Sequence, residues 1–102
     1  MRIEADKTAD ETIITVEGDI DLYTSPELRK VVLKAVPKAA IGVGIHLGGI
    51  TYMDSSGVAT LVEGLRSAKE HGKAFTLIAP STAVMKVLEL ARLDSIFEVR
   101  SD

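Results

Sequence analysis

The sequence contains no cysteine, no tryptophan, and only 2 tyrosines and 2 phenylalanines among its 102 residues. The absence of cysteine excludes disulfides, thiolate metal sites and cysteine catalysis. The scarcity of aromatic side chains argues against a platform on which nucleic-acid bases stack. No apolar run approaches the ~20 residues needed to span a bilayer, and the acidic N-terminal stretch is unlike a signal peptide. We therefore expect a cytoplasmic protein that binds neither membranes nor nucleic acids directly.

The charge is also low and evenly spread. The chain has 12 basic and 15 acidic residues, a net charge of -3, and no cluster of lysine and arginine. Binding to a phosphate backbone usually concentrates such residues into a patch, so the composition again disfavours a nucleic-acid ligand. The length suits one small domain, and a hydrophobic content of 46% is enough for a core. We expect a single domain spanning residues 1–102.

Strand-like and helix-like segments alternate along the chain. The β-branched residues at 12–18 predict a strand, and residues 2–6 fit a short edge strand joined to it as a hairpin. Further strands are expected at 41–47, 74–80 and 95–99, with a helical pattern before each of them. The order β-β-α-β-α-β-α-β predicts an α/β fold with a mixed, mostly parallel sheet of about five strands and three helices.

Each helix is predicted from its apolar spacing. The inward positions are Leu28, Val31, Val32, Ala35 and Val36 in the first helix, Val58, Leu61, Val62, Leu65 and Ala68 or Lys69 in the second, and Val84, Val87, Leu88 and Ala91 in the third. Thr24 and Glu27 have the spacing of a capping box, and Pro37 marks the end of the first helix. Gly72 is placed to end the second helix, and Ser81 to cap the third.

The strand at 41–47 has small residues on one face. Gly42, Gly44 and His46 alternate with large apolar residues, and strand glycines usually mark a close approach of another segment. We expect a helix to lie on that face. The loop that follows, residues 48–56, comes at the carboxyl end of a parallel strand, where ligands and partners of such sheets are commonly bound.

That loop ends in two adjacent serines, which have several interpretations. Asp54, Ser55 and Ser56 are each suited to cap a helix beginning near Gly57. A catalytic nucleophile is disfavoured, because the G-x-S-x-G elbow is absent and His46 is the only histidine near enough to activate a serine. A hydroxyl at a helix N-terminus also suits a phosphate, because free N–H groups and the positive end of the helix dipole face it.

Metal and phosphate-loop sites have weaker support. Asp19 and Asp21 are two residues apart, but the twelve-residue calcium pattern is missing, and turn formation explains both carboxylates. The phosphate-cradling G-x-x-x-x-G-K-[ST] motif is absent as well. We expect no metal and no cofactor.

Three stretches together resemble a known family. "GDIDLYTSPEL", "YMDSSGVATLV" and "LIAPSTAVMKVLELARLDSIFEV" are similar to the STAS domain of anti-sigma factor antagonists, over about residues 12–99. The resemblance implies partner switching. The unmodified protein binds an anti-sigma factor that is also a serine kinase, and so releases the sigma factor. Phosphorylation of the first serine ends that binding, and a PP2C-type phosphatase restores it.

The resemblance also assigns residues. It implies that Ser55 is the phosphate acceptor, surrounded by Asp21, Asp54, Ser56 and Gly57. The docking surface for the kinase is expected to comprise the Asp19–Thr24 loop, the Met53–Gly57 loop and the exposed side of the following helix. The residues of this expected surface are Asp19, Asp21, Thr24, Met53, Ser55, Gly57, Glu63 and Arg66. The free protein is expected to be a monomer that has no enzymatic activity.

Three departures from the family pattern accompany this resemblance. Relatives often have Asp or Asn in place of His46, and G-L-G where this chain has "GVA" after the serines. The sequence given ends at Asp102, which leaves the closing helix of many relatives short or absent.

The alternative function is that of a constitutive STAS adaptor in a lipid ABC transporter or an anion transporter, which phosphorylation does not regulate. The intact acceptor serine disfavours that alternative.

Overall fold

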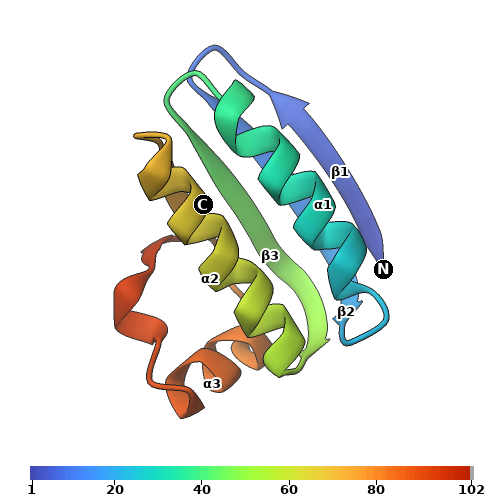
Figure 1. Cartoon of the computed structure of the whole chain (residues 1–102). Helices are drawn as coiled ribbons and strands as arrows, with labels where there is room; N and C mark the ends of the chain where they lie inside the picture. Colours follow the sequence, from blue (N-terminus) through green and yellow to red (C-terminus); the bar gives the residue numbers. More distant parts are fainter. Residues whose placement is uncertain (102) are drawn as a thin grey trace.

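The computed structural model describes residues 1–101, which form one α/β domain (Figure 1). Five strands make a single mixed sheet within these residues: β1 (Arg2–Lys7), β2 (Glu11–Ile20), β3 (Gly42–Met53), β4 (Ala74–Ile78) and β5 (Glu98–Arg100). The α-helices are α1 (Ser25–Ala35), α2 (Ser55–Glu70) and α3 (Thr82–Leu90), with short 3₁₀ helices η1 (Val36–Lys38) and η2 (Asp94–Ile96). The predicted fold class and element order are confirmed.

The strands lie in the sheet in the same order as in the chain. β1 pairs antiparallel with β2, and β2, β3, β4 and β5 follow one another in parallel. Because all parallel strands point the same way, their carboxyl ends meet at one edge of the sheet. The hairpin at the N-terminus and the parallel remainder agree with the sequence prediction.

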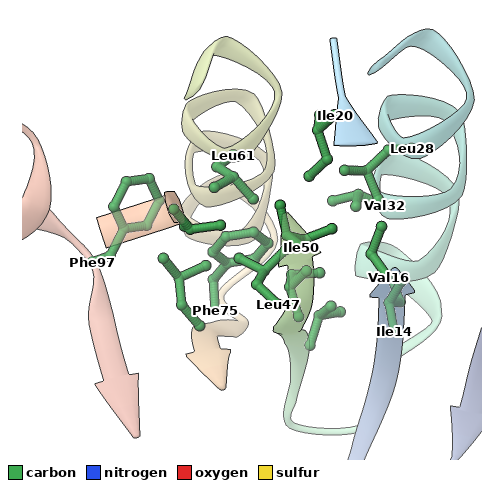
Figure 2. Packing of buried hydrophobic residues seen from close by; sticks show 14 of the residues in the cluster. Ile14, Val16, Ile20, Leu28, Val32, Leu47, Ile50, Leu61, Phe75 and Phe97 are labelled. Carbon is green, nitrogen blue, oxygen red and sulfur yellow. The ribbon is translucent and has the colours of Figure 1, made fainter. Parts of the chain in front are cut away.

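The core lies between the sheet and the helices. α1 and α2 cover one face of the sheet in Figure 1, and α3 lies beside the N-terminal end of α2. Figure 2 shows side chains from α1 and α2 meeting those of the strands. Fully buried residues of this cluster include Ile14, Ile45, Leu61, Leu77 and Leu88. The predicted inward faces of the helices are confirmed with one exception, since Ala91 is exposed. Of the alternatives Ala68 and Lys69, Ala68 is the buried one.

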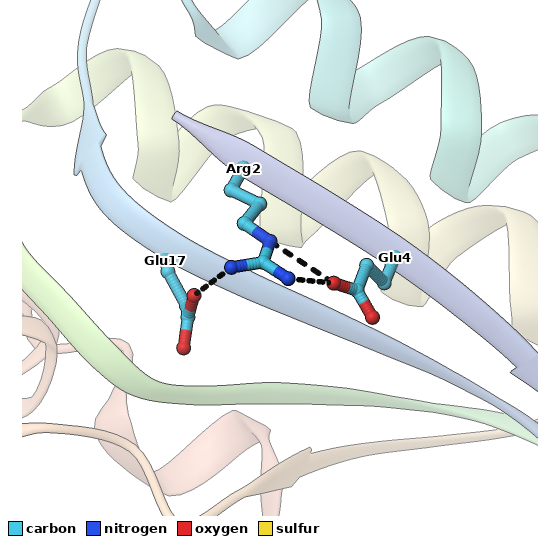
Figure 3. A network of polar contacts seen from close by, with 3 residues as sticks. All are labelled: Arg2, Glu4 and Glu17. Atoms are coloured by element: carbon cyan, nitrogen blue, oxygen red, sulfur yellow. Dashed lines mark hydrogen bonds and ion pairs between the residues drawn. The ribbon is translucent and has the colours of Figure 1, made fainter.

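A polar network lies on the opposite face of the sheet. Arg2 of β1 donates to the carboxylate of Glu4 at 2.6 Å and lies 3.8 Å from that of Glu17 on β2 (Figure 3). The pKa of Arg2 is raised by the hydrogen bond and charge of Glu4, and further by the charge of Glu17. All three side chains are more than half exposed. Water screens such pairs, so the network adds little to stability.

Two sequence predictions about β3 are wrong. The strand does not end near residue 47 but continues to Met53, because β2 extends beside it to Ile20. The glycine face is not covered by a helix. A Cβ on Gly44 would stand 2.6 Å from the Cδ1 of Ile78 and 3.1 Å from that of Ile13, so side chains of the neighbouring strands fill that space.

Within residues 1–101, no helix combines the length and the apolar content that crossing a membrane requires.

Candidate functional site

The carboxyl ends of β2 and β3 bring the two predicted loops together. Ile20 and Met53 are paired in the sheet, and the backbone N–H of Asp54 donates to the carbonyl of Ile20 at 3.1 Å. The Asp19–Thr24 segment therefore lies directly beside the start of α2. The predicted convergence of these loops is confirmed.

Asp54 caps α2. Its backbone is extended (φ -110°, ψ -170°), and its carboxylate accepts the backbone N–H of Ser56 at 2.9 Å. The same oxygen accepts the hydroxyl of Ser56. The hydroxyl of Ser56 is the main cause of the lowered pKa of Asp54, with smaller contributions from the backbone N–H groups of Ser56, Gly57 and Leu22. Of the three predicted capping candidates, Asp54 therefore fills the role, and it also ties the neighbouring loop to the helix.

The two serines differ in their surroundings. Ser56 is half-buried and its hydroxyl is held by Asp54. Ser55 occupies the first position of α2 and is exposed, and within residues 1–101 its hydroxyl has no hydrogen-bond partner. Of the two hydroxyl groups, that of Ser55 is the one available to an approaching protein.

The loop before α1 is held by Asp21 and Thr24. The Asp21 carboxylate accepts the backbone N–H of Tyr23 at 2.9 Å and that of Thr24 at 3.0 Å. The Thr24 hydroxyl accepts the N–H of Asp21 at 2.9 Å and donates to the carbonyl of Asp19 at 3.0 Å. The predicted capping box with Glu27 is therefore wrong, because the Thr24 hydroxyl bonds back into the loop and makes no cap to α1.

Three further predicted residues lie at this end of the sheet, namely Asp19, Met53 and Gly57. Asp19 is exposed and its carboxylate accepts the hydroxyl of Thr51 at 2.7 Å. Met53 is only 3% exposed, and a Cβ on Gly57 would stand 2.4 Å from the Met53 Cγ. The absence of a side chain at Gly57 thus lets α2 approach β3 closely. Met53 and Gly57 lie beneath the surface, whereas Ser55 lies on it.

Glu63 and Arg66 are placed farther along α2. Glu63 accepts from the Arg29 Nε of α1 at 2.6 Å, which links the two helices. Arg66 is exposed, and among the described residues it has no acidic partner within 4.0 Å. Of these two predicted contact residues, Arg66 is the one whose charge is uncompensated.

The histidines lie apart from the serines. His46 is half-buried and its Nδ1 accepts the backbone N–H of Gly48 at 3.3 Å, so the ring has a structural contact of its own. His71 caps the carboxyl end of α2, one helix length from Ser55. Within residues 1–101, no group of three His, Asp or Glu side chains is placed to hold a metal ion.

Four exposed apolar residues near this site were not singled out by sequence reasoning. Leu22, Tyr23 and Tyr52 flank the Asp54 cap, and Leu90 ends α3. Tyr23 is 88% exposed and Leu90 is 81% exposed. The signal was present for Leu90, since it falls outside the inward spacing of Val84, Val87 and Leu88. For Leu22 and Tyr23, only their position in the loop between Asp21 and Ser25 pointed to exposure.

The chain is similar in sequence to known proteins. A family model described as "Mlab, STAS domain" matches residues 3–99. The chain is 27% identical over 96 residues to the anti-sigma-B factor antagonist of Listeria monocytogenes, covering 94% of this chain and 84% of that protein.

Solved structures share the fold. An anti-sigma factor antagonist from Mycobacterium paratuberculosis superposes with a TM-score of 0.87 at 20% identity, over 99% of this chain and 86% of that one. The anti-sigma factor antagonist SpoIIAA in its unphosphorylated form superposes with a TM-score of 0.81 at 20% identity, over 99% and 90% of the two chains. The phosphorylated form of the Bacillus cell fate determinant SpoIIAA gives 0.77 at 19% identity, over 99% and 92%.

Proposed function

The chain belongs to the STAS domain family, and from that premise we propose that it is an anti-sigma factor antagonist that works by partner switching. In the unphosphorylated state it binds an anti-sigma factor that is a serine kinase, and the sigma factor is released. Phosphorylation of Ser55 ends this binding, and a PP2C-type phosphatase restores it. The chain acts in the cytoplasm by binding, as a monomer when free, and its partners supply the catalysis.

The observation that carries the proposal is the environment of Ser55. It is the exposed hydroxyl at the first position of α2, next to the Asp54 cap and beside the Asp21 loop. A kinase must bring its phosphoryl donor to the acceptor oxygen, so the acceptor has to be reachable and free. Ser56 is half-buried and bonded to Asp54, which makes it the poorer acceptor.

The switch follows from where the phosphate would lie. A phosphoserine adds roughly -1.5 to -2 charges. At the N-terminus of a helix the fold tolerates this charge, because the dipole favours an anion there by about 0.3–1 kcal/mol. In an interface that fits a neutral hydroxyl, the same phosphate loses water without a prepared partner. A penalty of about 4 kcal/mol would weaken the affinity close to a thousandfold, since each 1.4 kcal/mol is tenfold.

The partner surface centres on this serine. Asp19, Asp21 and Thr24 contribute the loop beside it, while Met53 and Gly57 support the surface from below. Glu63 and Arg66 extend the surface along α2. Charge at the edge of such a surface mainly affects the association rate and the choice of partner.

A phosphorylation assay tests the proposal. The anti-sigma serine kinases encoded by the source genome are purified, and each is incubated with the chain and ATP. Mass spectrometry then localises any phosphate, and calorimetry measures complex formation before and after modification. We expect one kinase to bind the unmodified chain and to phosphorylate it. If no kinase binds or modifies the chain, the proposal fails.

The second candidate is a constitutive STAS adaptor of a transport complex. It stays open because the matching family model is described as a STAS domain and its description does not name an antagonist. An adaptor would stay unmodified in the same assay, and a Ser55→Asp variant would keep its partner.

A further inference from the structure

One ion pair joins the last strand of the sheet to the second. The Nη2 of Arg100 donates to the carboxylate of Glu11 at 2.6 Å, although the two residues are 89 positions apart in the chain. β3 and β4 lie between β2 and β5, so the pair reaches across both strands. The Glu11 side chain is 27% exposed and that of Arg100 is 39% exposed, which makes this the least exposed ion pair within residues 1–101. Partial burial reduces the screening that weakens surface pairs.

The register of the strands places this pair on the face of the sheet that α1 and α2 leave open. Arg100 is paired with Ile78, and paired residues of neighbouring strands point to the same face. The Cδ1 atoms of Ile78 and Ile13 both lie beside Gly44, and Ile13 shares its face with Glu11, two residues earlier on β2. Ile78 is only 2% exposed although no helix covers it. Side chains that cross this face therefore supply the cover, and the ion pair is one such crossing.

β5 has few other attachments to the sheet. It is an edge strand of three residues that pairs with β4 alone, through Glu98, Val99 and Arg100. Glu98 and Val99 are exposed. The residue before the strand is better anchored, since Phe97 is 6% exposed and its ring centroid lies 6.4 Å from that of Phe75. Short segments with few buried contacts are those that open locally in native proteins.

The turn after β4 opposes the docking of β5. Ala79 has a φ of 46°, in the left-handed region that is unfavourable for a residue with a Cβ. Its backbone N–H donates to the carbonyl of Arg100 at 2.6 Å. Arg100 thus holds the strained turn through its main chain and Glu11 through its side chain. Strained backbone persists only where the surrounding structure fixes it, so release of Arg100 would let Ala79 relax.

We propose that the Glu11–Arg100 pair acts as a latch, which keeps β5 on the sheet against the strain at Ala79. In the open state the ion pair is broken, β5 leaves β4 as far back as the anchor at Phe97, and the N–H of Ala79 reaches water. The remainder of the domain stays folded. This conformational device is separate from the proposed function, because neither latch residue belongs to the surface around Ser55.

Hydrogen exchange of single backbone amides, followed by NMR on the free chain, tests the latch. The amide of Ala79 reports on β5, because it is hydrogen-bonded to Arg100. The amide of Ile45 reports on global unfolding, because this residue is fully buried in β3, between β2 and β4. Rates are compared as protection factors, which correct for the intrinsic exchange rate of each residue type.

Three changes and one control are needed. Glu11→Ala removes the carboxylate, Arg100→Met removes the guanidinium but keeps an aliphatic stem, and the double variant removes both charges. Ala79→Gly relieves the strain, because glycine adopts a left-handed conformation readily. Glu4→Ala is the matched control, because Glu4 also forms an ion pair of 2.6 Å, with Arg2 of its own strand. Circular dichroism melting checks that each variant is folded.

In the wild type we expect lower protection at Ala79 than at Ile45. Glu11→Ala and Arg100→Met should each lower the protection at residue 79 about fivefold, the upper end for a partly exposed ion pair. The double variant should lower it no further, because both single changes break the same contact. Ala79→Gly should raise the protection at residue 79, whereas Glu4→Ala should leave it unchanged.

Three results would overturn the inference. Equal protection of the Ala79 and Ile45 amides in the wild type would show that β5 leaves the sheet only when the whole domain unfolds. Additive effects of Glu11→Ala and Arg100→Met would show that the two residues act separately and not as one latch. Unchanged or lower protection in Ala79→Gly would show that the turn does not oppose docking.

Discussion

The carboxylate of Asp54 and the hydroxyl of Ser56 are hydrogen-bonded to each other in the first turn of α2, while Ser55 between them is exposed. One carboxylate therefore caps the helix and also accepts the hydroxyl of the second serine. The two serines have the same hydroxyl group, but in the structure that of Ser56 is hydrogen-bonded and that of Ser55 is exposed. This inequality supports the choice of Ser55 as the acceptor.

The first prediction concerns which serine is phosphorylated. We expect phosphate on Ser55 in the wild-type chain and in Ser56→Ala, and none in Ser55→Ala, because the hydroxyl of Ser56 is engaged by Asp54. Mass spectrometry of the fragment that contains both serines distinguishes them. Phosphate on Ser56 in the Ser55→Ala protein, formed at the wild-type rate, would refute this choice.

The second prediction separates binding from folding. Ser55→Asp should bind the kinase at least about a hundredfold more weakly, corresponding to about 2.7 kcal/mol, whereas Ser55→Ala should bind constitutively. Both should melt near the wild-type temperature, since surface substitutions usually change stability by less than about 0.5 kcal/mol. Calorimetric titration and thermal melting measure the two effects. An aspartate variant that binds normally, or one that is unfolded, would contradict the mechanism.

The third prediction uses the lowered pKa of Asp54. A carboxylate whose pKa is lowered in the folded state stabilises the protein above the unfolded-state pKa, about 3.9. This contribution is lost as the pH falls through the lower folded-state value. Asn caps helices about as well as Asp but does not titrate. We therefore expect Asp54→Asn to be less stable than the wild type at pH 7, with the difference shrinking below about pH 4.

Urea unfolding between pH 7 and pH 3 measures this difference. Glu4→Gln is a suitable control, because Glu4 is an exposed carboxylate on the opposite face of the sheet. A difference between wild type and Asp54→Asn that stays constant down to pH 3 would show that Asp54 does not titrate as inferred.

The fourth prediction concerns the contact between α2 and β4. A Cβ on Gly64 would stand 2.7 Å from the Cζ of Phe75 and 2.9 Å from the Cγ1 of Val32. Alanine is the better helix former by about 1 kcal/mol, but overpacking costs about 1–3 kcal/mol. Packing should prevail, so Gly64→Ala should lower the melting temperature by several degrees.

The comparison variant for this test is Lys69→Ala, which changes an exposed position of the same helix. It should change the stability by less than about 0.5 kcal/mol, as surface substitutions usually do, and so leave the melting temperature nearly unchanged. A Gly64→Ala protein more stable than the wild type would show that the helix shifts to admit the methyl group.

The fifth prediction concerns the loop beside the acceptor. Asp21→Asn keeps an oxygen that can accept the N–H groups of Tyr23 and Thr24, so the loop should persist. A charge on the proposed partner surface is lost, and we expect slower association with the kinase and little change in dissociation, because charges at an interface act mainly on the association rate. Surface plasmon resonance at two salt concentrations measures both rates. An unchanged association rate would remove Asp21 from the proposed surface.

The helices were predictable because their apolar spacing reports a buried face directly. Val32, Leu61 and Leu88 occupy predicted inward positions, and each is buried. The cap of α3 by Ser81 was predictable for the same local reason, and its side chain accepts the N–H of Val84. Local patterns thus recovered the elements whose stabilising contacts lie within a few residues.

Features that depend on distant residues were not recovered. β3 continues through Gly48 and Gly49, which read as a loop, because β2 pairs with it through an irregular register up to Ile20. Thr24 has the spacing of a capping residue, but its hydroxyl is hydrogen-bonded to the carbonyl of Asp19 and the carboxylate of Asp21 instead. The choice among the capping candidates at 54–56 also depended on backbone geometry. At the site, the sequence indicated which residues converge but not which of them are buried.

The order of the strands has a consequence for how the chain acquires its structure. Since spatial order follows chain order, every strand pairs with the one synthesised just before it, and no strand has to be inserted between two that are already paired. Each pairing with the preceding strand closes a shorter loop than a pairing with a more distant strand would, which lowers the entropy cost of loop closure. The sheet can therefore grow outward from the β1–β2 hairpin as the polypeptide leaves the ribosome. The serine-bearing turn is then shaped once β3 has docked on β2, a pairing that requires neither β4 nor β5.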